Sequence, residues 1–140
     1  MTDNIYELDF INIDVKNKIK QILVNDDNKK RMSFSYIFNF TNKYLKNEKC
    51  IVANTDIYFD NSLSLLLNYN LDKTFISLTR YDIKNSVPEL ASGLDSYIFQ
   101  SPINLDLDII NFKFGIPFCD YRLMAEVIKV VIMLLILLLQ

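Results

Sequence analysis

Residues 50–63 read CIVANTDIYFDNSL, a short apolar run followed by two acids. The first five letters, CIVAN, are too few for a helix, and an apolar run of this length is typical of a strand buried on both faces. Asp56 and Asp60 follow at a spacing of one helical turn, and the leucines behind them predict a short helix that begins near Asn61 or Ser62. Ligands of open α/β sheets bind at the carboxyl ends of the strands. The stretch therefore predicts that Asp56 lies at the edge of a ligand-binding crevice.

Helical and strand patterns alternate on both sides of this stretch. Apolar residues at helical spacing predict one helix within residues 3–24 and a second, which begins with a serine cap, over 33–46. Residues rich in β-branched and aromatic side chains predict strands at 74–82 and 96–103, and a last helix is expected over 119–129. This order predicts a single α/β domain in which at least part of the sheet is parallel.

The composition of the 140-residue chain excludes several classes of site. Histidine is absent, which removes Ser-His-Asp triads, Cys-His pairs and the usual transition-metal sites. Two isolated glycines cannot form a glycine-rich phosphate loop, and a net charge of −2 gives no footprint for nucleic acid. Cys50 and Cys119 form neither a metal-type spacing nor a disulfide framework, and no secretory segment opens the chain. A cytoplasmic setting is therefore expected.

A carboxylate at residue 56 can bind a hard divalent cation, which in turn neutralises a diphosphate. Such a cation holds phosphates without a glycine-rich loop. Asp60 is either a second ligand or an acid favoured by the positive end of the following helix. We favour this structural interpretation for Asp60. For Asp56 we favour the functional one, because Asn54 and Thr55 place further polar groups beside it.

Four blocks of the chain resemble a group of bacterial and viral proteins of the GT-A type of nucleotide-sugar glycosyltransferases. They read IVANTDIYFDNSL, FISLTRYDI, SGLDSYIFQSPI and FGIPFCDYRLMAEV, in that order, between residues 50 and 127. The resemblance implies a partial GT-A fold, a three-layer arrangement of a sheet with flanking helices. It also implies transfer of a sugar from a nucleotide-sugar donor to a glycan or another hydroxyl acceptor.

In the GT-A fold a D-x-D motif ends a strand and binds a divalent metal and the donor diphosphate. The resemblance places this motif on Asn54, Thr55 and Asp56, and it implies Mn²⁺ or Mg²⁺ held by Asp56 and Asp60. The first acid of the motif is an asparagine here. An amide oxygen can still coordinate a cation, but the site has one negative charge fewer.

Four charged residues of the later blocks are expected around the same crevice. Arg80 is a candidate for the donor phosphates, and its alternative is a surface ion pair with Asp82. The resemblance places Asp95 against the sugar and Asp120 beside the acceptor. An inverting transferase needs a carboxylate to take the proton of the acceptor hydroxyl. Asp120 is the first choice for this base and Asp95 the second, while a helix N-cap is the structural alternative for Asp120.

The two ends depart from this pattern. Before residue 50 no first strand or nucleotide-gripping loop stands out, so the amino end of a domain over 1–129 is expected to be shortened. The tail, 130–140, is almost uniformly apolar and too short to span a bilayer as a helix. One A/T-rich choice of codons for the tail encodes GYNVINPSFT when read from its third base, close to the G-Y-x-V-x-N-P-S expected in relatives. We therefore hypothesise that residues from about Val130 onward are a frameshift product and that the chain is a fragment of a longer gene. The alternatives are that the tail forms a buried helix or an interfacial segment.

Three functions remain open from the sequence. The first is an active glycosyltransferase with the donor and acceptor described above. The second is an inactive remnant that binds a sugar or a protein partner through exposed apolar surface. The third is a peripheral membrane protein held by the tail.

Overall fold

A computed structural model describes residues 7, 9–21, 31–84, 87–91 and 93–137, and the chain divides into two units, Met1–Met32 and Ser33–Gln140. In the first unit, a single helical turn, α1 (Ile13–Lys16), is capped by the side chain of Asn12, which accepts from the Asp14 N–H. The helix predicted within 3–24 is therefore too long over the described residues, and residues 3–6, 8 and 22–24 lie outside them. None of the α1 residues is buried, and a helical segment without a packed face is only marginally stable.

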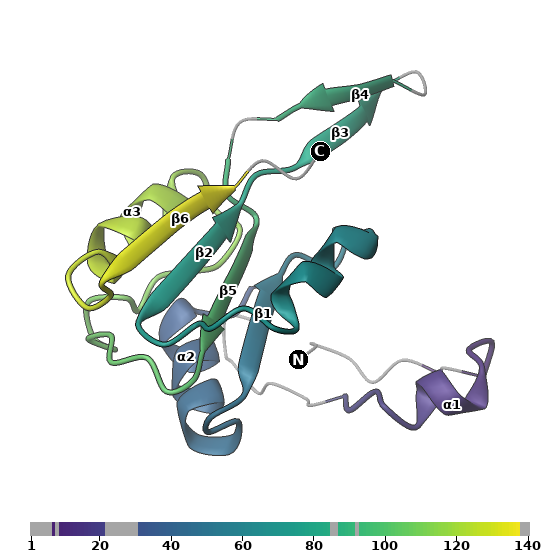
Figure 1. Cartoon of the computed structure of the whole chain (residues 1–140), viewed down its shortest axis with the longest axis horizontal. Helices are drawn as coiled ribbons and strands as arrows, with labels where there is room; N and C mark the ends of the chain where they lie inside the picture. Colours follow the sequence, from purple (N-terminus) through teal and green to yellow (C-terminus); the bar gives the residue numbers. More distant parts are fainter. Residues whose placement is uncertain (1–6, 8, 22–30, 85–86, 92, 138–140) are drawn as a thin grey trace. The chain divides into compact units, whose positions relative to one another are not determined.

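The second unit contains a mixed sheet of four strands in the order β1-β5-β2-β6 (Figure 1). The strand β5 (Ser96–Gln100) runs antiparallel to β1 (Lys49–Ala53) on one side and to β2 (Thr74–Leu78) on the other. The strand β6 (Met133–Leu137) pairs with β2 in parallel. The expected α/β class and a partly parallel sheet are thus confirmed. The tail was considered as a buried helix, which is wrong for Met133–Leu137 because these residues form a strand.

The predicted strand over 74–82 is two strands in two different sheets. After β2 the chain leaves the four-stranded sheet, and β3 (Tyr81–Lys84) pairs antiparallel with β4 (Val87–Leu90). The Ala91 N–H donates to the Arg80 carbonyl at 3.0 Å, which closes the base of this hairpin. In Figure 1 the hairpin extends away from the four-stranded sheet.

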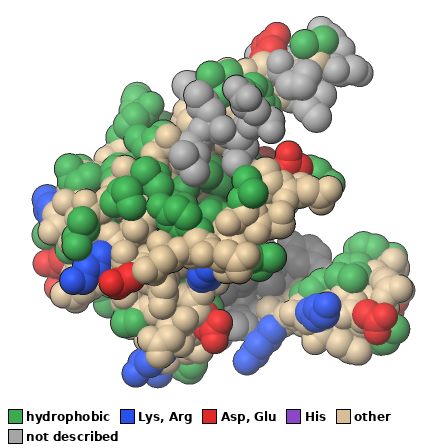
Figure 2. Space-filling model, viewed as in Figure 1, with side chains coloured by type: hydrophobic (Ala, Val, Ile, Leu, Met, Phe, Trp, Pro, Cys, Tyr) green, Lys and Arg blue, Asp and Glu red, His purple; other side chains and the backbone are tan. Residues whose placement is uncertain are grey.

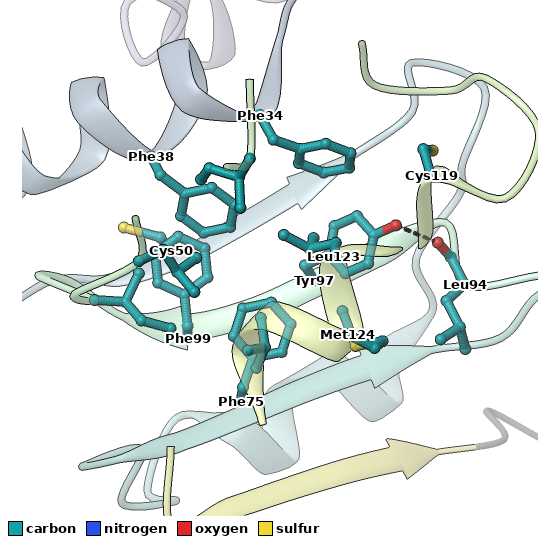
Figure 3. Packing of buried hydrophobic residues seen from close by; sticks show 14 of the residues in the cluster. Phe34, Phe38, Cys50, Phe75, Leu94, Tyr97, Phe99, Cys119, Leu123 and Met124 are labelled. Carbon is teal, nitrogen blue, oxygen red and sulfur yellow. Dashed lines mark hydrogen bonds between the residues drawn. The ribbon is translucent and has the colours of Figure 1, made fainter. Parts of the chain in front are cut away.

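Two helices of the second unit share one hydrophobic core with the sheet. The helix α2 (Phe34–Tyr44) begins as predicted, with the Ser33 hydroxyl accepting from the Tyr36 N–H at 3.3 Å. The helix α3 (Cys119–Val127) is the predicted last helix. Figure 3 shows side chains from both helices and from β1, β2 and β5 in this core: Phe34, Phe38, Cys50, Phe75, Leu94, Tyr97, Phe99, Cys119, Leu123 and Met124.

A smaller apolar cluster forms on other side chains of the same strands. It joins Ile76 and Leu78 of β2 with Ile98 of β5, and leucines of the 3₁₀ helix η1 (Asn61–Leu66) pack against it. The short helix expected near Asn61 is therefore confirmed as a 3₁₀ helix. The prediction that the CIVAN strand is buried on both faces is wrong, because β1 lies at the sheet edge and 42% of Ile51 is exposed.

Lys49 ties β1 to the end of η1. Its ammonium group donates to the carbonyls of Leu66, Leu67 and Tyr69 at 2.8, 2.7 and 2.7 Å. These carbonyls lie at the carboxyl end of η1, where a cation is favoured.

We expect Lys49→Met to lower the free energy of unfolding by about 1–2 kcal/mol, because charge-assisted hydrogen bonds to these carbonyls are lost. Chemical denaturation measures the change. Lys46→Met, at another exposed lysine, is the control and should stay within about 0.5 kcal/mol of the parent. Equal effects of the two substitutions would contradict a role for the carbonyl contacts.

Ser77 in β2 is fully buried, and within the described part of the chain its hydroxyl has no hydrogen-bond partner. A buried hydroxyl without a partner keeps its desolvation cost. We expect Ser77→Ala to leave the free energy of unfolding unchanged or to raise it by up to about 1 kcal/mol.

Ser101→Ala is the matched control, because Ser101 is equally buried but its hydroxyl donates to Asn42 Oδ1 at 3.3 Å. This substitution should destabilise the protein by about 1 kcal/mol. Urea denaturation of the two variants side by side distinguishes the two serines. A loss at Ser77 as large as that at Ser101 would show that the Ser77 hydroxyl is satisfied in solution.

Candidate functional site

A cleft of about 430 Å³ opens at the end of the four-stranded sheet where β1 and β2 finish and β5 begins. Asn54 follows the last residue of β1, and Arg80 lies two residues beyond the end of β2. Because β5 is antiparallel to both strands, residues 93–95, which precede it, lie at the same end of the sheet. Tyr97 of β5 and residues 114–121, the loop before α3 and its first turn, complete the lining. The cleft is therefore built from four segments that lie far apart in the sequence.

Four of the predicted site residues line this cleft together. They are Asn54, Arg80, Asp95 and Asp120. Asp82 lies in β3, outside the lining residues, but it binds Arg80 directly. Thr55 and Asp56 are exposed in the turn after β1 and do not line the cleft.

Arg80 is held between two carboxylates. Its Nε donates to Asp82 Oδ1 at 2.8 Å, and its Nη1 donates to Asp95 Oδ2. The hydrogen bond to Asp82, followed by the charge of Asp95, raises the pKa of the guanidinium. The ion pair with Asp82, considered as the alternative role of Arg80, is therefore present. Arg80 reaches the cleft already engaged with two negative side chains.

Asp95 has both carboxylate oxygens engaged. Besides the bond from Arg80 to Oδ2, Oδ1 accepts from Asn54 Nδ2 at 3.1 Å. The backbone is tied in the same place, because the Asp95 N–H donates to the Leu78 carbonyl at 3.2 Å. Asp95 thereby joins the segments after β1 and β2 to the segment before β5. Both oxygens of the Asp95 carboxylate therefore already accept hydrogen bonds from the protein.

Asp120 lies on the opposite segment, in the first turn of α3. Its Oδ2 accepts from the Leu94 N–H at 3.0 Å. The N-cap of α3 is Phe118, which makes no side-chain cap hydrogen bond, so the interpretation of Asp120 as an N-cap is wrong. The two acids flank Gly93, where a Cβ would lie 3.6 Å from Asp95 Oδ2 and 3.7 Å from Asp120 Oδ2. Both carboxylates therefore face one small region of the cleft.

Tyr97 connects this region to the hydrophobic core. Its hydroxyl donates to the Leu94 carbonyl at 2.6 Å, the bond drawn dashed in Figure 3. Burial, assisted by the negative charges of Asp120 and Asp95, raises the pKa of Tyr97, so the hydroxyl keeps its proton. The carbonyl of Leu94 is thus bound by the buried Tyr97 hydroxyl, and its N–H is bound by Asp120.

Exposed aromatic side chains form the rim of the cleft, and sequence reasoning missed them. Phe118 is 78% exposed and Tyr121 is 59% exposed. Phe118 has φ 65° and ψ 6°, a left-handed conformation that is uncommon for a bulky residue and costs about 1–2 kcal/mol. No pattern in FGIPFCDYR reveals this backbone conformation, and an aromatic residue ahead of a helix is usually assigned to the core.

Of the two residues expected to bind a metal, Asp60 is engaged with Ser62 in this structure. Asp60 Oδ1 accepts from the Ser62 N–H at 2.8 Å and from the Ser62 hydroxyl at 2.5 Å, so it caps η1. The bond from the Ser62 hydroxyl is the largest cause of the lowered pKa of Asp60. Within the described ranges, no three acidic or cysteine side chains come together in a group that could hold a metal ion. Cation binding by Asp56 and Asp60 stays a prediction.

The helices of the structure can be compared with the length that a membrane span needs. Over the residues that the structure describes, no helix has the length and apolar character needed to cross a bilayer. The frameshift hypothesis for 130–140 stays a prediction.

Comparison of the chain with protein-family models, with curated proteins and with solved structures gives no match. The GT-A assignment is therefore a resemblance of sequence blocks.

Proposed function

We propose that the second unit is a glycosyltransferase-like domain of partial GT-A type and that its cleft holds the sugar transferred from a nucleotide-sugar donor. The observation that carries this proposal is the convergence of four residues on one cleft: Asn54, Arg80, Asp95 and Asp120. Each of the four blocks that resemble the glycosyltransferases contributes one of them. A resemblance by chance gives no reason for the four blocks to meet at one cavity.

The chemistry assigns different roles to the two acids. Transfer forms a bond between the acceptor oxygen and the anomeric carbon, breaks the bond to the nucleoside diphosphate and releases the acceptor proton. Asp95 accepts from Arg80 through Oδ2 and from Asn54 through Oδ1, so both of its oxygens are already engaged. Within the described residues, the Asp120 carboxylate accepts a hydrogen bond from the Leu94 N–H through Oδ2. We therefore assign the acceptor proton to Asp120 Oδ1, and Asp95 positions the sugar.

Arg80 is not assigned to the donor phosphates. Its Nε and Nη1 donate to Asp82 and Asp95, so a phosphate would have to displace a carboxylate. This arrangement favours a second candidate function, in which the cleft binds a sugar without transferring it. That candidate corresponds to the inactive remnant considered from the sequence.

A panel of UDP- and GDP-sugars tests the proposal. The protein is incubated with each donor and a mixture of glycan acceptors, with and without Mn²⁺, and products are detected by mass spectrometry. Transfer by the parent protein, reduced in Asp95→Asn but not in Asp72→Asn, supports the proposal. Asp72 is the control because it is exposed and outside the cleft.

Thermal unfolding with the same donors distinguishes the two candidates. Stabilisation by nucleotide sugars without product supports the binding function. Neither product nor stabilisation with any donor would overturn both.

A further inference from the structure

The charged side chains at the cleft are predominantly negative. Asp95 and Asp120 line the cleft, and Asp82, which lies outside the lining, shares Arg80 with Asp95, so three negative charges stand against the one positive charge of the guanidinium. This group of four described side chains therefore has a formal net charge of −2. Arg80 is the basic residue among the described residues that line the cleft, and its hydrogen bonds are directed at Asp82 and Asp95.

The hydrogen-bonding character of the cleft matches its charge. An ionised carboxylate accepts hydrogen bonds and cannot donate them, so Asp95 and Asp120 suit ligand groups that donate. Hydroxyl groups and ammonium groups donate, whereas a ligand carboxylate does not. The exposed rings of Phe118 and Tyr121 add apolar surface on which the C–H face of a sugar ring can pack.

A carboxylate on a ligand would meet like charge in the cleft. It would lie near Asp95 and Asp120, and the guanidinium that could compensate it is already shared by two acids. Specificity of this kind comes from repulsion of the wrong ligand as much as from attraction of the right one.

We propose that the cleft selects a sugar that is uncharged or bears an amino group and rejects sugars that bear a carboxylate. The proposal rests on the proposed function as far as the cleft binds a sugar. It adds the class of sugar, and it holds whether the sugar is transferred or only bound.

Matched donors that differ in one group test this selectivity. UDP-glucose and UDP-glucuronate differ only in a hydroxymethyl group against a carboxylate, and UDP-galactose and UDP-galacturonate form a second pair. Dissociation constants are measured by calorimetry at low and at high NaCl. We expect the neutral member of at least one pair to bind about tenfold more tightly or better at low salt. The ratio should fall at high salt, because screening weakens charge repulsion but not shape discrimination.

A variant separates charge from shape. Asp120→Asn removes one negative charge with almost no change in size, so it should reduce the preference for the neutral donor several-fold, while Asp72→Asn should leave it unchanged. Equal or tighter binding of the uronates, or a preference that does not respond to salt, would overturn the selectivity and leave the proposed function standing. Failure of every donor to bind would overturn both.

Discussion

Replacing Asp120 with Asn is expected to lower kcat for the proposed sugar transfer by about 10²- to 10⁴-fold, the range attributed to a general base. The KM for the donor should change little, because the role proposed for this acid concerns the acceptor proton. The amide oxygen of Asn can still accept from the Leu94 N–H, a bond of 3.0 Å in the parent. Initial rates with the best donor and acceptor from the panel measure the effect.

The fold of this variant should survive. A negative charge in the first turn of α3 contributes at most about 1 kcal/mol through the helix dipole, so thermal unfolding should shift only slightly. Asp95→Asn is the informative comparison, because it breaks the pairing with Arg80 and Asn54 and should raise KM. A transfer rate that is unchanged in Asp120→Asn would assign the proton to another group.

Replacing Phe38 with Ala is expected to lower the free energy of unfolding by about 3–5 kcal/mol. The ring is fully buried, and its centroid lies 5.1 Å from that of Phe99 and 6.5 Å from that of Phe75 (Figure 3). Removing it leaves a cavity between α2 and the sheet as well as losing transfer free energy. Because domains of this size have a total stability of about 5–15 kcal/mol, the loss is a large fraction. Urea denaturation at 25 °C measures it.

Phe40 on the same helix provides a matched control. It is partly exposed and packs on Tyr44 with a centroid separation of 4.9 Å, outside the core. Phe40→Ala makes the same change of side chain and should cost about 1 kcal/mol or less. A loss equal to that of Phe38→Ala would mean that α2 does not bury the face seen in the structure.

Local signals explain which elements could be predicted from the sequence. The start of α2 was predictable because Ser33 is a strong cap and the following aromatic residues repeat at helical spacing. The position of β1 was predictable because its apolar run is bounded by polar residues. Its burial was not, because an edge strand and a central strand differ only in their neighbours, which the run itself does not contain.

Tertiary contacts explain the misses. The strand pattern over 74–82 continues through Arg80, but the chain leaves the sheet there because the Arg80 carbonyl accepts from Ala91 and its side chain turns to two acids. The helix predicted within 3–24 follows its own periodicity, yet periodicity alone does not stabilise a helix without a surface to pack on.

The site was predicted in part. Convergence of Asn54, Arg80, Asp95 and Asp120 on one cleft agrees with the expected crevice. Asp56 could not be placed from the sequence, because the direction of a side chain in the turn after a strand depends on the path of that turn. The aromatic rim was missed for a similar reason, since the left-handed conformation of Phe118 leaves no trace in residue types.

The strand β6 has a consequence for the behaviour of the protein in solution. It contains only apolar residues and lies at the edge of the four-stranded sheet, so one row of its peptide groups faces away from β2. Hydrophobic side chains gather over this part of the second unit (Figure 2), and Ile132 and Ile136 are among those exposed. Such an edge carries none of the charges or prolines that normally discourage strand addition from another molecule. The protein should therefore aggregate increasingly as its concentration rises. Ile136→Lys should raise the concentration at which the purified protein begins to precipitate.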